Sequence, residues 1–349
     1  MTLARTAASA AAETTVPILD LRRLHGSGEE RAAFLAGLRA AIRRFGAFYL
    51  SGHGVDPDLV AQGFALSRRF FALPDAEKLA IEMVHSPHFR GYTRPGWERT
   101  RGLADWREQV DIGSERPALP GGPDAPAWQR LEGPNQWPAA LPELRPGILA
   151  LQAALTEVTL RLLRAVSLAV GQREDALDPI VAERPTQLVK LIRYPGHDAV
   201  PEDSSQGVGP HKDSGLLTLV LQHERGGLQI ETPAGWLDVP PRPGTVVVNA
   251  GELLELATDG YFRAAVHRVV TPPAGVERLS IAFFLGARLD ARVPVLPLPP
   301  DLKAEARGPE RDPLNPLFHD VGANALKGRL RSHPDVASRH HADLLAATA

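Results

Sequence analysis

The sequence of 349 residues predicts an α+β fold. Its core is mainly β and of the jelly-roll type, and helices precede and follow this core along the chain. Two observations carry this prediction. From residue 188 onward the chain consists of many short apolar or β-branched runs separated by Gly and Pro, which is typical of a β-sandwich or barrel. Before that point, apolar residues recur at helical spacing, most clearly over residues 144–170. We find no internal repeat.

The first half of the chain is expected to supply strands and helices that flank the β core. Phe34, Leu38 and Ile42 fall on one face of a helix, and Asp56 is a suitable cap for the next one. The long apolar pattern after residue 143 predicts a core helix that supports the sheet. The expected elements are strands over 16–21 and 45–51 and helices over 29–44, 56–71 and 144–170, with a proline-rich surface connection over 114–147.

The second half is expected to supply the core strands. Pro195-Gly196 and Pro240-Pro-Arg-Pro-Gly244 interrupt the apolar runs and mark turns between them. The chain then ends in a proline-rich surface segment and helical stretches. The expected elements are strands over 188–194, 216–221, 227–231, 236–239 and 245–249, a short helix or turn over 252–258, two further strands that carry His267 and Arg278, the surface segment over 292–316 and helices over 317–345.

Composition limits the chemistry. The formal net charge is -2, so no overall basic field favours nucleic acid or anionic membranes. The chain has no cysteine, which excludes disulfides, thiolate zinc sites and a cysteine nucleophile, so that a bound metal would need His, Asp or Glu. The N-terminus has no apolar signal region, and no run approaches the ~18 apolar residues of a membrane span. We therefore expect a cytoplasmic protein.

Three residues form a candidate metal site. His211 and Asp213 stand two apart at the start of a predicted strand, so both side chains lie on one face. His267 follows Asp213 after 53 intervening residues, within the apolar run Ala-Ala-Val-His-Arg-Val-Val. Two imidazoles and one carboxylate form the facial set that binds non-haem Fe(II) and leaves other positions open.

A second group points to a carboxylate ligand. Arg278 and Ser280 share one face of the strand that continues as Ile-Ala-Phe-Phe-Leu, and a guanidinium grips a carboxylate in a bidentate manner. Tyr194 ends a neighbouring strand and can donate a phenol hydrogen bond to the same carboxylate. Three protein ligands on an octahedral ion leave three positions open for other ligands.

These motifs resemble the isopenicillin N synthase-like family of Fe(II)- and 2-oxoglutarate-dependent oxygenases. The supporting stretches are Leu191-Ile-Arg-Tyr194-Pro, Gly226-Gly-Leu-Gln229, Val248-Asn249-Ala-Gly251, His267-Arg268-Val269, Val16-Pro-Ile-Leu-Asp-Leu and Phe45-Gly-Ala-Phe-Tyr-Leu-Ser-Gly-His53-Gly. The resemblance implies a cupin-like, double-stranded β-helix core. It also implies one oxygenase domain over 16–349, with an N-terminal region (16–185), a jelly-roll core (186–290) and a C-terminal helical segment (291–349). Residues 1–15 are small and polar, and we expect them to form a disordered tail.

The resemblance implies an oxidoreductase of secondary metabolism that hydroxylates or desaturates a small molecule, with Fe(II), 2-oxoglutarate and O2 as cofactor and cosubstrates and with succinate and CO2 formed. His211, Asp213 and His267 would be the metal ligands and the catalytic centre, and Arg278, Ser280 and Tyr194 would bind 2-oxoglutarate. Expected substrate contacts are Tyr92, Arg94, Trp97 and Phe283. We expect a monomer or homodimer without nucleic-acid or membrane partners.

Two alternatives stay open at this point. Family members that use no 2-oxoglutarate also carry the Arg-x-Ser pair, so an isopenicillin N synthase-like iron oxidase or cyclase is one. A non-catalytic jelly-roll binding protein, with a structural triad, is the other. His53 is interpreted as a turn residue and Asn249 as the end of its strand. The remaining histidines are expected on the surface: His25, His85, His88, His197, His223, His319, His333, His340 and His341.

Overall fold

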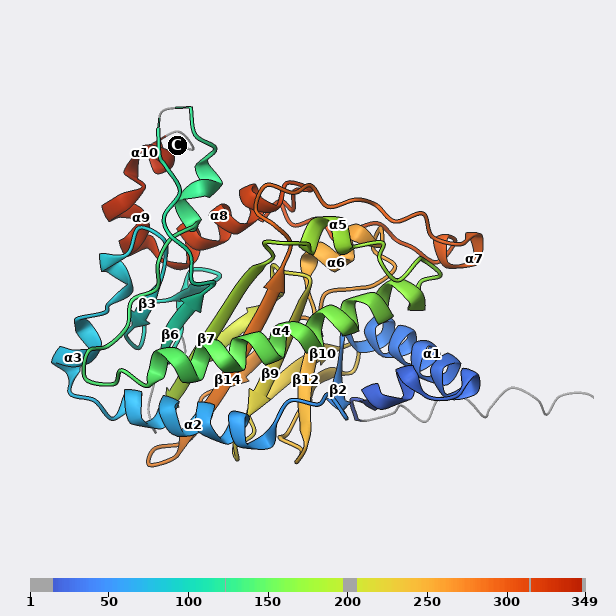
Figure 1. Ribbon diagram of the computed structural model, residues 1–349, viewed down its shortest axis with the longest axis horizontal. Helices are drawn as coiled ribbons and strands as arrows, with labels where there is room; N and C mark the ends of the chain where they lie inside the picture. The colour runs from blue at the N-terminus through green and yellow to red at the C-terminus, as the bar shows by residue number, and fades with distance from the viewer. Residues whose placement is uncertain (1–14, 123, 197–205, 314, 347–349) are drawn as a thin grey trace, which may run out of the picture.

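The computed structural model describes residues 15–122, 124–196, 206–313 and 315–346 (Figure 1). Nearly all of the expected disordered tail, and His197 with most of the loop that precedes His211, lie outside these residues. The core contains two sheets. The larger sheet has the order β1(Ile18–Asp20), β2(Ala47–Ser51), β12(Thr245–Ala250), β9(Leu217–Gln222), β14(Glu277–Gly286), β7(Thr186–Pro195), β6(Glu108–Gly113) and β3(Gly91–Thr93).

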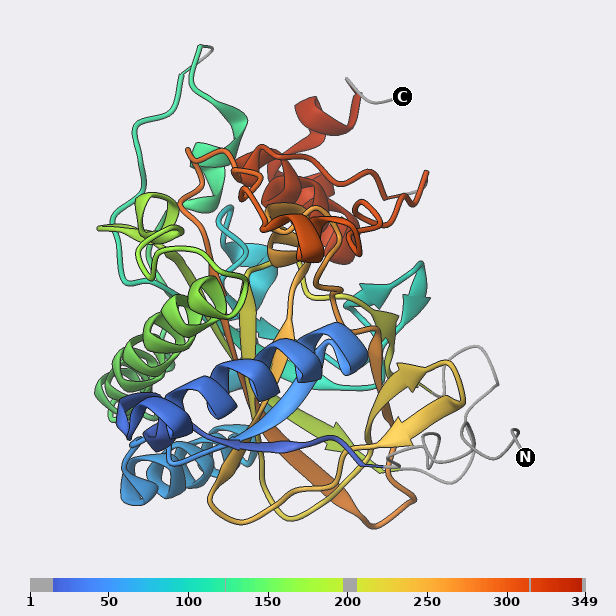
Figure 2. The same cartoon turned by 90° about the vertical axis from the view of Figure 1, so that its right-hand side faces the viewer.

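The smaller sheet lies over one face of the larger one. Its order is β11(Gly235–Asp238), β10(Leu228–Thr232), β13(His267–Val270) and β8(Gln206–His211). The Nε of Arg278 on β14 donates to the carbonyl of Gly226 just before β10 at 2.9 Å, which ties the two sheets together. Figure 2 shows the β10–β11 hairpin and helix α4 on opposite sides of the large sheet. This arrangement of two facing sheets with flanking helices confirms the predicted double-stranded β-helix core.

Three helices cover the other face of the large sheet: α1(Gly28–Phe45), α2(Pro57–Phe71) and α4(Leu144–Ala169) (Figure 1). Helix α1 begins with a capping box between Ser27 and Glu30 and ends at Gly46, whose φ of 65° is left-handed. A Cβ at Gly46 would lie 2.7 Å from the backbone nitrogen of Ala265, so glycine is required there. Gly46 alone therefore joins the first helix to β2.

Helix α4 is the central support of the sheet. Of the described helices, it alone is long and apolar enough to cross a membrane by length and composition. Its core-facing side chains Ile148, Leu151 and Leu155 are fully buried, and the helix contacts α2, β9 and β14. Gly63 of α2 allows this close packing, because a Cβ there would meet Leu151 at 2.8 Å and Ile281 at 3.2 Å. The predicted core helix is confirmed.

Residue alternation along β14 gives the large sheet two chemically different faces. Ile281 contacts the α2 glycine, so Leu279, Ile281, Phe283 and Leu285 point toward the helices, which we call the outer face. Arg278, Ser280, Ala282 and Phe284 point the other way, toward the smaller sheet, which we call the inner face. Strand pairing extends this inner face to Gln222, Val220 and Thr218 of β9, to Tyr194, Ile192 and Lys190 of β7, and to Gln109 and Asp111 of β6.

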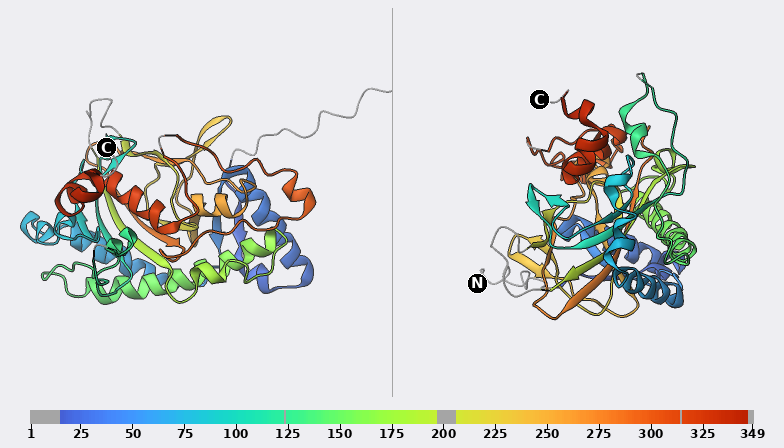
Figure 3. Two further views of the ribbon diagram at one scale, coloured as in Figure 1. Left: turned by 90° about the horizontal axis from the view of Figure 1, so that it is seen from above. Right: turned by 90° about the vertical axis from the view of Figure 1, so that its left-hand side faces the viewer.

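The C-terminal segment packs beside the first half of the chain. Helices α8(Val321–Ser332), α9(Pro334–His340) and α10(Ala342–Ala346) lie near η2(Met83–His85) and η3(Ala127–Leu131) (Figure 3). A small second core forms there around Phe89 and Val336. The expectation that His333 and His341 are surface residues is wrong, because both are 1% exposed and the His341 ring stacks on Phe89 at 5.2 Å.

The remaining elements are short connections. Asp20 caps the 3-10 helix η1(Leu21–His25) by accepting a hydrogen bond from the backbone nitrogen of Arg22. They are η1(Leu21–His25), α3(Asp75–Leu79), β4(Arg99–Thr100), β5(Leu103–Ala104), α5(Asp178–Val181), α6(Glu252–Ala257) and α7(Pro300–Lys303).

Candidate active site

His211, Asp213 and His267 converge at the mouth of the smaller sheet. His211 ends β8, His267 begins β13, and the two residues are direct partners in the strand register. Their Nε2 atoms lie 3.8 Å and 3.7 Å from Oδ1 of Asp213. One ligand atom from each of the three side chains falls within 4.8 Å of the others. Residues from distant parts of the sequence thus form one compact donor set.

The protonation state of this set suits a metal ion. The Nδ1 atoms of His211 and His267 contact the carbonyls of Gly209 and Ala265 at 2.8 Å and 3.0 Å, and since a carbonyl only accepts, both Nδ1 atoms carry protons. Each Nε2 therefore presents a lone pair. Burial, reinforced by neighbouring His267, lowers the pKa of His211 to about 3 and keeps the ring neutral. Oδ2 of Asp213 is buried without a partner among the described residues, and a bound cation would satisfy it.

Arg278 forms a second centre on the inner face. Its side chain is 1% exposed, with Nη1 donating to Oγ of Ser280 and Nη2 to Oε1 of Gln222, both at 3.1 Å. The guanidinium lies 4.8 Å from the ring centroid of Tyr194. Within the described part of the chain, its hydrogen-bond partners are uncharged, and burial lowers its pKa. A ligand carboxylate would supply the missing counter-charge.

The structure places two of the four expected substrate contacts, Tyr92 and Phe283, on the outer face and so away from this centre. Tyr92 pairs in register with Val110 and points to the outer face, where its hydroxyl donates to Glu108 at 2.7 Å. Arg94 pairs with Glu82 at 2.6 Å and covers the ring of Trp97, which is 43% exposed.

Phe283 is the fourth of these residues, and it lies on the outer face of β14, opposite Arg278 and Ser280. The aromatic residue that β14 places on the inner face is Phe284. The prediction of Phe283 was inconsistent with strand alternation, because Phe284, not Phe283, stands at an even spacing from Arg278 and Ser280.

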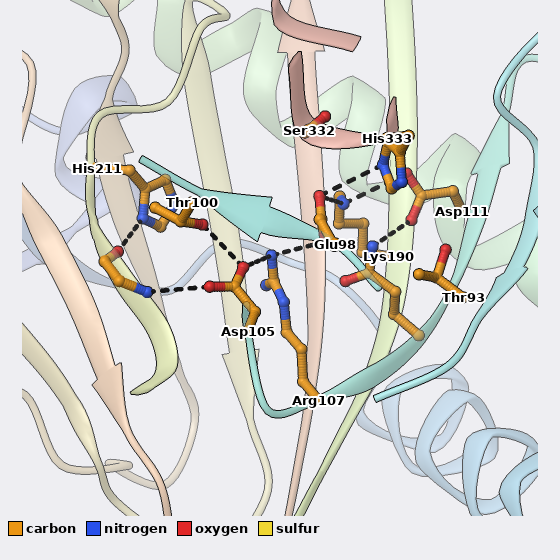
Figure 4. Close-up of polar contacts among 12 residues, drawn as sticks. Thr93, Glu98, Thr100, Asp105, Arg107, Asp111, Lys190, His211, Ser332 and His333 are labelled. Atoms are coloured by element: carbon orange, nitrogen blue, oxygen red, sulfur yellow. Dashed lines mark hydrogen bonds and ion pairs between the residues drawn. The ribbon is translucent and has the colours of Figure 1, made fainter. Parts of the chain in front are cut away.

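Several charged residues also line the inner face, and sequence reasoning missed most of them. Lys190 stands in the apolar run Leu-Val-Lys-Leu-Ile at an even spacing from Tyr194, so alternation alone placed both on one face. The same alternation joins Asp111 to this face through its register with Lys190. Figure 4 shows these side chains together with Glu98, Asp105, Arg107 and His333.

Two further polar residues on the inner face have no partner among the described atoms. Asn249 and Thr218 oppose each other across β12 and β9, and both are at most 1% exposed. The two residues after Asn249 make backbone hydrogen bonds close to the triad in sequence. The carbonyl of Ala250 accepts from the nitrogen of Ala265, two residues before His267, and the nitrogen of Gly251 donates to the carbonyl of Leu216, three residues after Asp213. The interpretation of Asn249 as a strand-terminal residue agrees with its place near the end of β12.

Lys212 points away from the triad, as expected for the middle of His-x-Asp. Its Nζ lies 3.0 Å from Glu255 of α6 and 2.6 Å from Glu310 in the C-terminal connection. Burial opposes the charge of Lys212, but these two carboxylates raise its pKa. Lys212 thus fastens the ligand-bearing segment to two other parts of the chain.

A jelly roll that carries two histidines and a carboxylate beside a buried arginine defines a mononuclear non-haem metal oxygenase. Comparison with known families makes this specific. Residues 16–140 match the family described as non-haem dioxygenase in morphine synthesis N-terminal, and residues 185–287 match the 2OG-Fe(II) oxygenase superfamily. The chain belongs to the isopenicillin N synthase-like 2-oxoglutarate-Fe(II) oxygenases.

Similar proteins support this assignment along almost the whole chain. A 2-oxoglutarate-dependent dioxygenase, frbJ, of Dothideomycetidae sp. (strain 11243) is 36% identical over 341 residues, covering 93% of this chain and 91% of the relative. A homoarginine-6-hydroxylase of Arabidopsis thaliana is 32% identical and covers 80% and 86%. A solved 2OG-Fe(II) oxygenase family protein from Caulobacter crescentus superposes with a TM-score of 0.71 at 28% identity, covering 91% and 98%.

The chain is therefore a non-haem iron dioxygenase that uses 2-oxoglutarate, O2 and Fe(II), and the predicted enzyme class and cofactors are confirmed. The family membership favours this activity over an oxidase without 2-oxoglutarate and over a non-catalytic binding protein. A full-length Neurospora crassa protein solved in complex with alpha-KG and thymine also superposes with a TM-score of 0.71 at 25% identity, covering 89% and 97%.

Proposed function

We propose that His211, Asp213 and His267 hold the Fe(II), and that Arg278, with Ser280 and Tyr194, binds the distal carboxylate of 2-oxoglutarate. The proposal rests on one observation: each centre lacks a charged partner, and the two missing charges have opposite signs. The triad has a buried carboxylate oxygen with no partner among the described residues, and Arg278 is a buried cation whose described partners are uncharged. A metal cation and a dicarboxylate together correct both deficits.

The side chains have separate tasks in this scheme. Bound Fe(II) supplies the chemistry that couples decarboxylation of 2-oxoglutarate to oxidation of the substrate. The Gly209 and Ala265 carbonyls fix the imidazole rings so that each Nε2 faces the ion. Ser280 and Gln222 orient the guanidinium of Arg278, and the sheets exclude water around it. Succinate and CO2 leave as co-products of hydroxylation or desaturation.

The proposed substrate is a small molecule rather than nucleic acid or a membrane lipid. The relatives' names support this, because the Neurospora crassa structure is a complex with thymine and the Arabidopsis relative is a homoarginine-6-hydroxylase. A monomer or homodimer in the cytoplasm stays a prediction from the sequence.

Anaerobic titration of the metal-free protein with Fe(II) and 2-oxoglutarate, followed by visible absorption, tests the proposed site. We expect a weak charge-transfer band that needs both additions. His267→Ala should abolish the band, and Arg278→Ala should raise the 2-oxoglutarate concentration for half-saturation by about 30-fold or more, since losing one partner of a buried charge pair costs roughly 2–5 kcal/mol. Iron binding without a band in the wild-type protein would contradict the cosubstrate site, and absence of iron binding would contradict the triad.

A further inference from the structure

A network of buried ions lies on the inner face beside the metal triad (Figure 4). Glu98 is its centre, with Nη2 of Arg107 at 2.8 Å and Nζ of Lys190 at 2.9 Å. The outer contacts are Arg107 to Asp105 at 3.2 Å, Lys190 to Asp111 at 3.3 Å, Arg329 to Asp111 at 2.7 Å and His333 to Glu98 at 3.5 Å. We call the three central residues, Glu98, Arg107 and Lys190, the charged wall.

The charged wall adjoins both proposed centres. Oδ1 of Asp105 accepts from the backbone nitrogen of Gly209 at 3.3 Å, and the carbonyl of Gly209 orients His211. On the other side, Tyr194 adjoins both guanidiniums. Burial opposes the charge of Arg107, yet Glu98, Asp105 and then a hydrogen bond with Tyr194 raise its pKa. Lys190 shares its face of β7 with Tyr194, so the wall and the side chains proposed to bind the cosubstrate line the same inner face.

The residues of the network differ in exposure: Asp105 and Asp111, which we call the anchors, are fully buried, and the three wall residues are slightly exposed. Asp105 is 0% exposed and also accepts from Thr100 at 2.8 Å, while Asp111 is 1% exposed and accepts from Gln109 at 3.1 Å. In contrast, each residue of the charged wall retains 7–8% exposure. The anchors thus fix the wall, and the wall residues present the polar surface.

Charge balance decides which ligand suits this wall. The network joins three carboxylates to the three cations Arg107, Lys190 and Arg329. Burying such ions gives little stability compared with apolar packing, so stability does not explain them. A ligand with one net charge would leave one buried charge of the site without a partner. An apolar ligand would displace water from the ions without replacing the hydrogen bonds that the water made. A molecule with one carboxylate and one cationic nitrogen satisfies both signs.

We propose that the charged wall binds the substrate of this enzyme, and that the substrate is a small zwitterion of the amino-acid class. Its carboxylate pairs with Arg107 and Lys190, and its cationic nitrogen pairs with Glu98. This inference rests on the proposed function, because it places the substrate beside the iron held by the triad. Helix α8 completes the site through Arg329, and His333 follows directly after this helix.

The test uses the full-length protein with Fe(II), 2-oxoglutarate and O2. The probes are the standard amino acids with ornithine and citrulline, and the readouts are succinate formation and the melting temperature of the metal-free protein. We expect at least one amino acid to raise both. Its analogues that lack only the amino group or only the carboxylate should need at least about 10-fold higher concentration, since one charge-assisted hydrogen bond contributes on the order of a factor of ten. These comparisons need no variant.

Glu98→Gln and Lys190→Met add the residue-level test, with Glu108→Gln as the matched control. Glu108 is another buried carboxylate with two cationic partners, Arg193 at 2.6 Å and Lys78 at 3.4 Å, and it accepts from Tyr92, whose side chain points to the outer face. We expect each wall variant to raise the half-maximal amino-acid concentration by about 10-fold or more, and the control to change it less than about two-fold.

Three results would overturn the inference. The first is a wild-type protein with the charge-transfer band whose turnover and melting temperature respond to none of the amino acids. The second is an equal response to analogues that lack one charge. The third is an equal effect of Glu98→Gln and Glu108→Gln. Absence of the band itself would overturn the proposed function, so the two failures are distinct.

Discussion

The first residues of β14 carry different kinds of side chain on the two faces of the strand, although these residues alternate along one chain. The outer residues Ile281 and Phe283 are fully buried against the helices, while the inner residues Arg278 and Ser280 form a buried polar centre. All four are less than 3% exposed. Burial therefore does not separate structural from functional residues here, and the face of the sheet does.

The same contrast holds for buried ions. Glu108 takes part in a hydrogen bond with outward-pointing Tyr92, whereas Glu98 contacts Lys190 on the inner face next to the triad. Both carboxylates have two cationic partners, so their chemistry is alike and their location differs. The predictions that follow test whether location assigns the role.

The largest expected effect is on the outer face. Phe283→Ala should lower the free energy of unfolding by about 3–5 kcal/mol, because it leaves a cavity between β14 and the helices. Denaturant unfolding measures this loss. The protein that remains folded should keep the Fe(II)–2-oxoglutarate absorption and its half-saturation concentration. A variant of normal stability with weakened cosubstrate binding would instead place Phe283 in the site, as the sequence first suggested.

On the inner face, the contribution of Asp105 to the free energy of unfolding should depend on pH. Burial raises the pKa of Asp105 to about 6 from an ordinary value of 3.8, so the folded state holds this proton more tightly than the unfolded state. Its contribution to stability is complete below pH 3.8 and is lost as the pH rises through 6. The stability of the wild type relative to Asp105→Asn should fall by about 1.4 kcal/mol per pH unit between about pH 4 and 6.

Unfolding free energies at about pH 4, 5, 6 and 7 for both proteins measure this difference. Above about pH 6.5 the difference should stop changing. A difference that rises with pH instead would mean that the hydrogen bonds from Thr100, Gln206 and Gly209 outweigh burial.

The smallest expected effect distinguishes two inner-face hydroxyls. Ser280→Ala removes the oxygen that accepts from Arg278 and should weaken 2-oxoglutarate binding by about three- to ten-fold, the value of one hydrogen bond. Thr218→Val is the matched control, since its buried hydroxyl has no partner among the described atoms. Titration of the absorption band compares them, with no change expected for Thr218→Val. Equal weakening by both variants would show that the whole inner face, rather than the Arg278 centre, controls the cosubstrate.

The sequence was sufficient to predict helices and strands, because their apolar residues recur every two to four positions. The helix predicted over 29–44 is observed as Gly28–Phe45, and the strand predicted over 188–194 lies within Thr186–Pro195. The i, i+2 spacing of Arg278 with Ser280 placed that pair correctly on one face of β14. For His211 and Asp213 the structure differs from the predicted strand start, because β8 ends at His211 and Asp213 follows it outside any strand. The long-range convergence of His267 with His211 followed from the family resemblance, because no local rule connects residues on separate strands.

The sequence was insufficient where a side chain's role depends on distant partners. Glu98 and Lys190 stand 92 positions apart and meet only because β6 and β7 pair beside the loop that carries Glu98. His333 looked like a surface histidine because its burial depends on α8 and α9 packing against Phe89 and the charged wall. Tyr92 was expected at the site from the family resemblance, but it lies on β3, where strand alternation turns its ring outward.

The charged wall has a consequence for how this enzyme can change over evolutionary time. The network around it comes from residues 98–111, from β7 and, through Arg329 and His333, from the C-terminal segment, whereas the metal ligands come from β8, the residues just after it and β13. A mutation that exchanges a wall charge replaces none of the atoms that orient His211 and His267, which are the backbone carbonyls of Gly209 and Ala265. With the substrate role proposed for the wall, a change of substrate requires mutations in one set of segments, and the metal ligands lie in another.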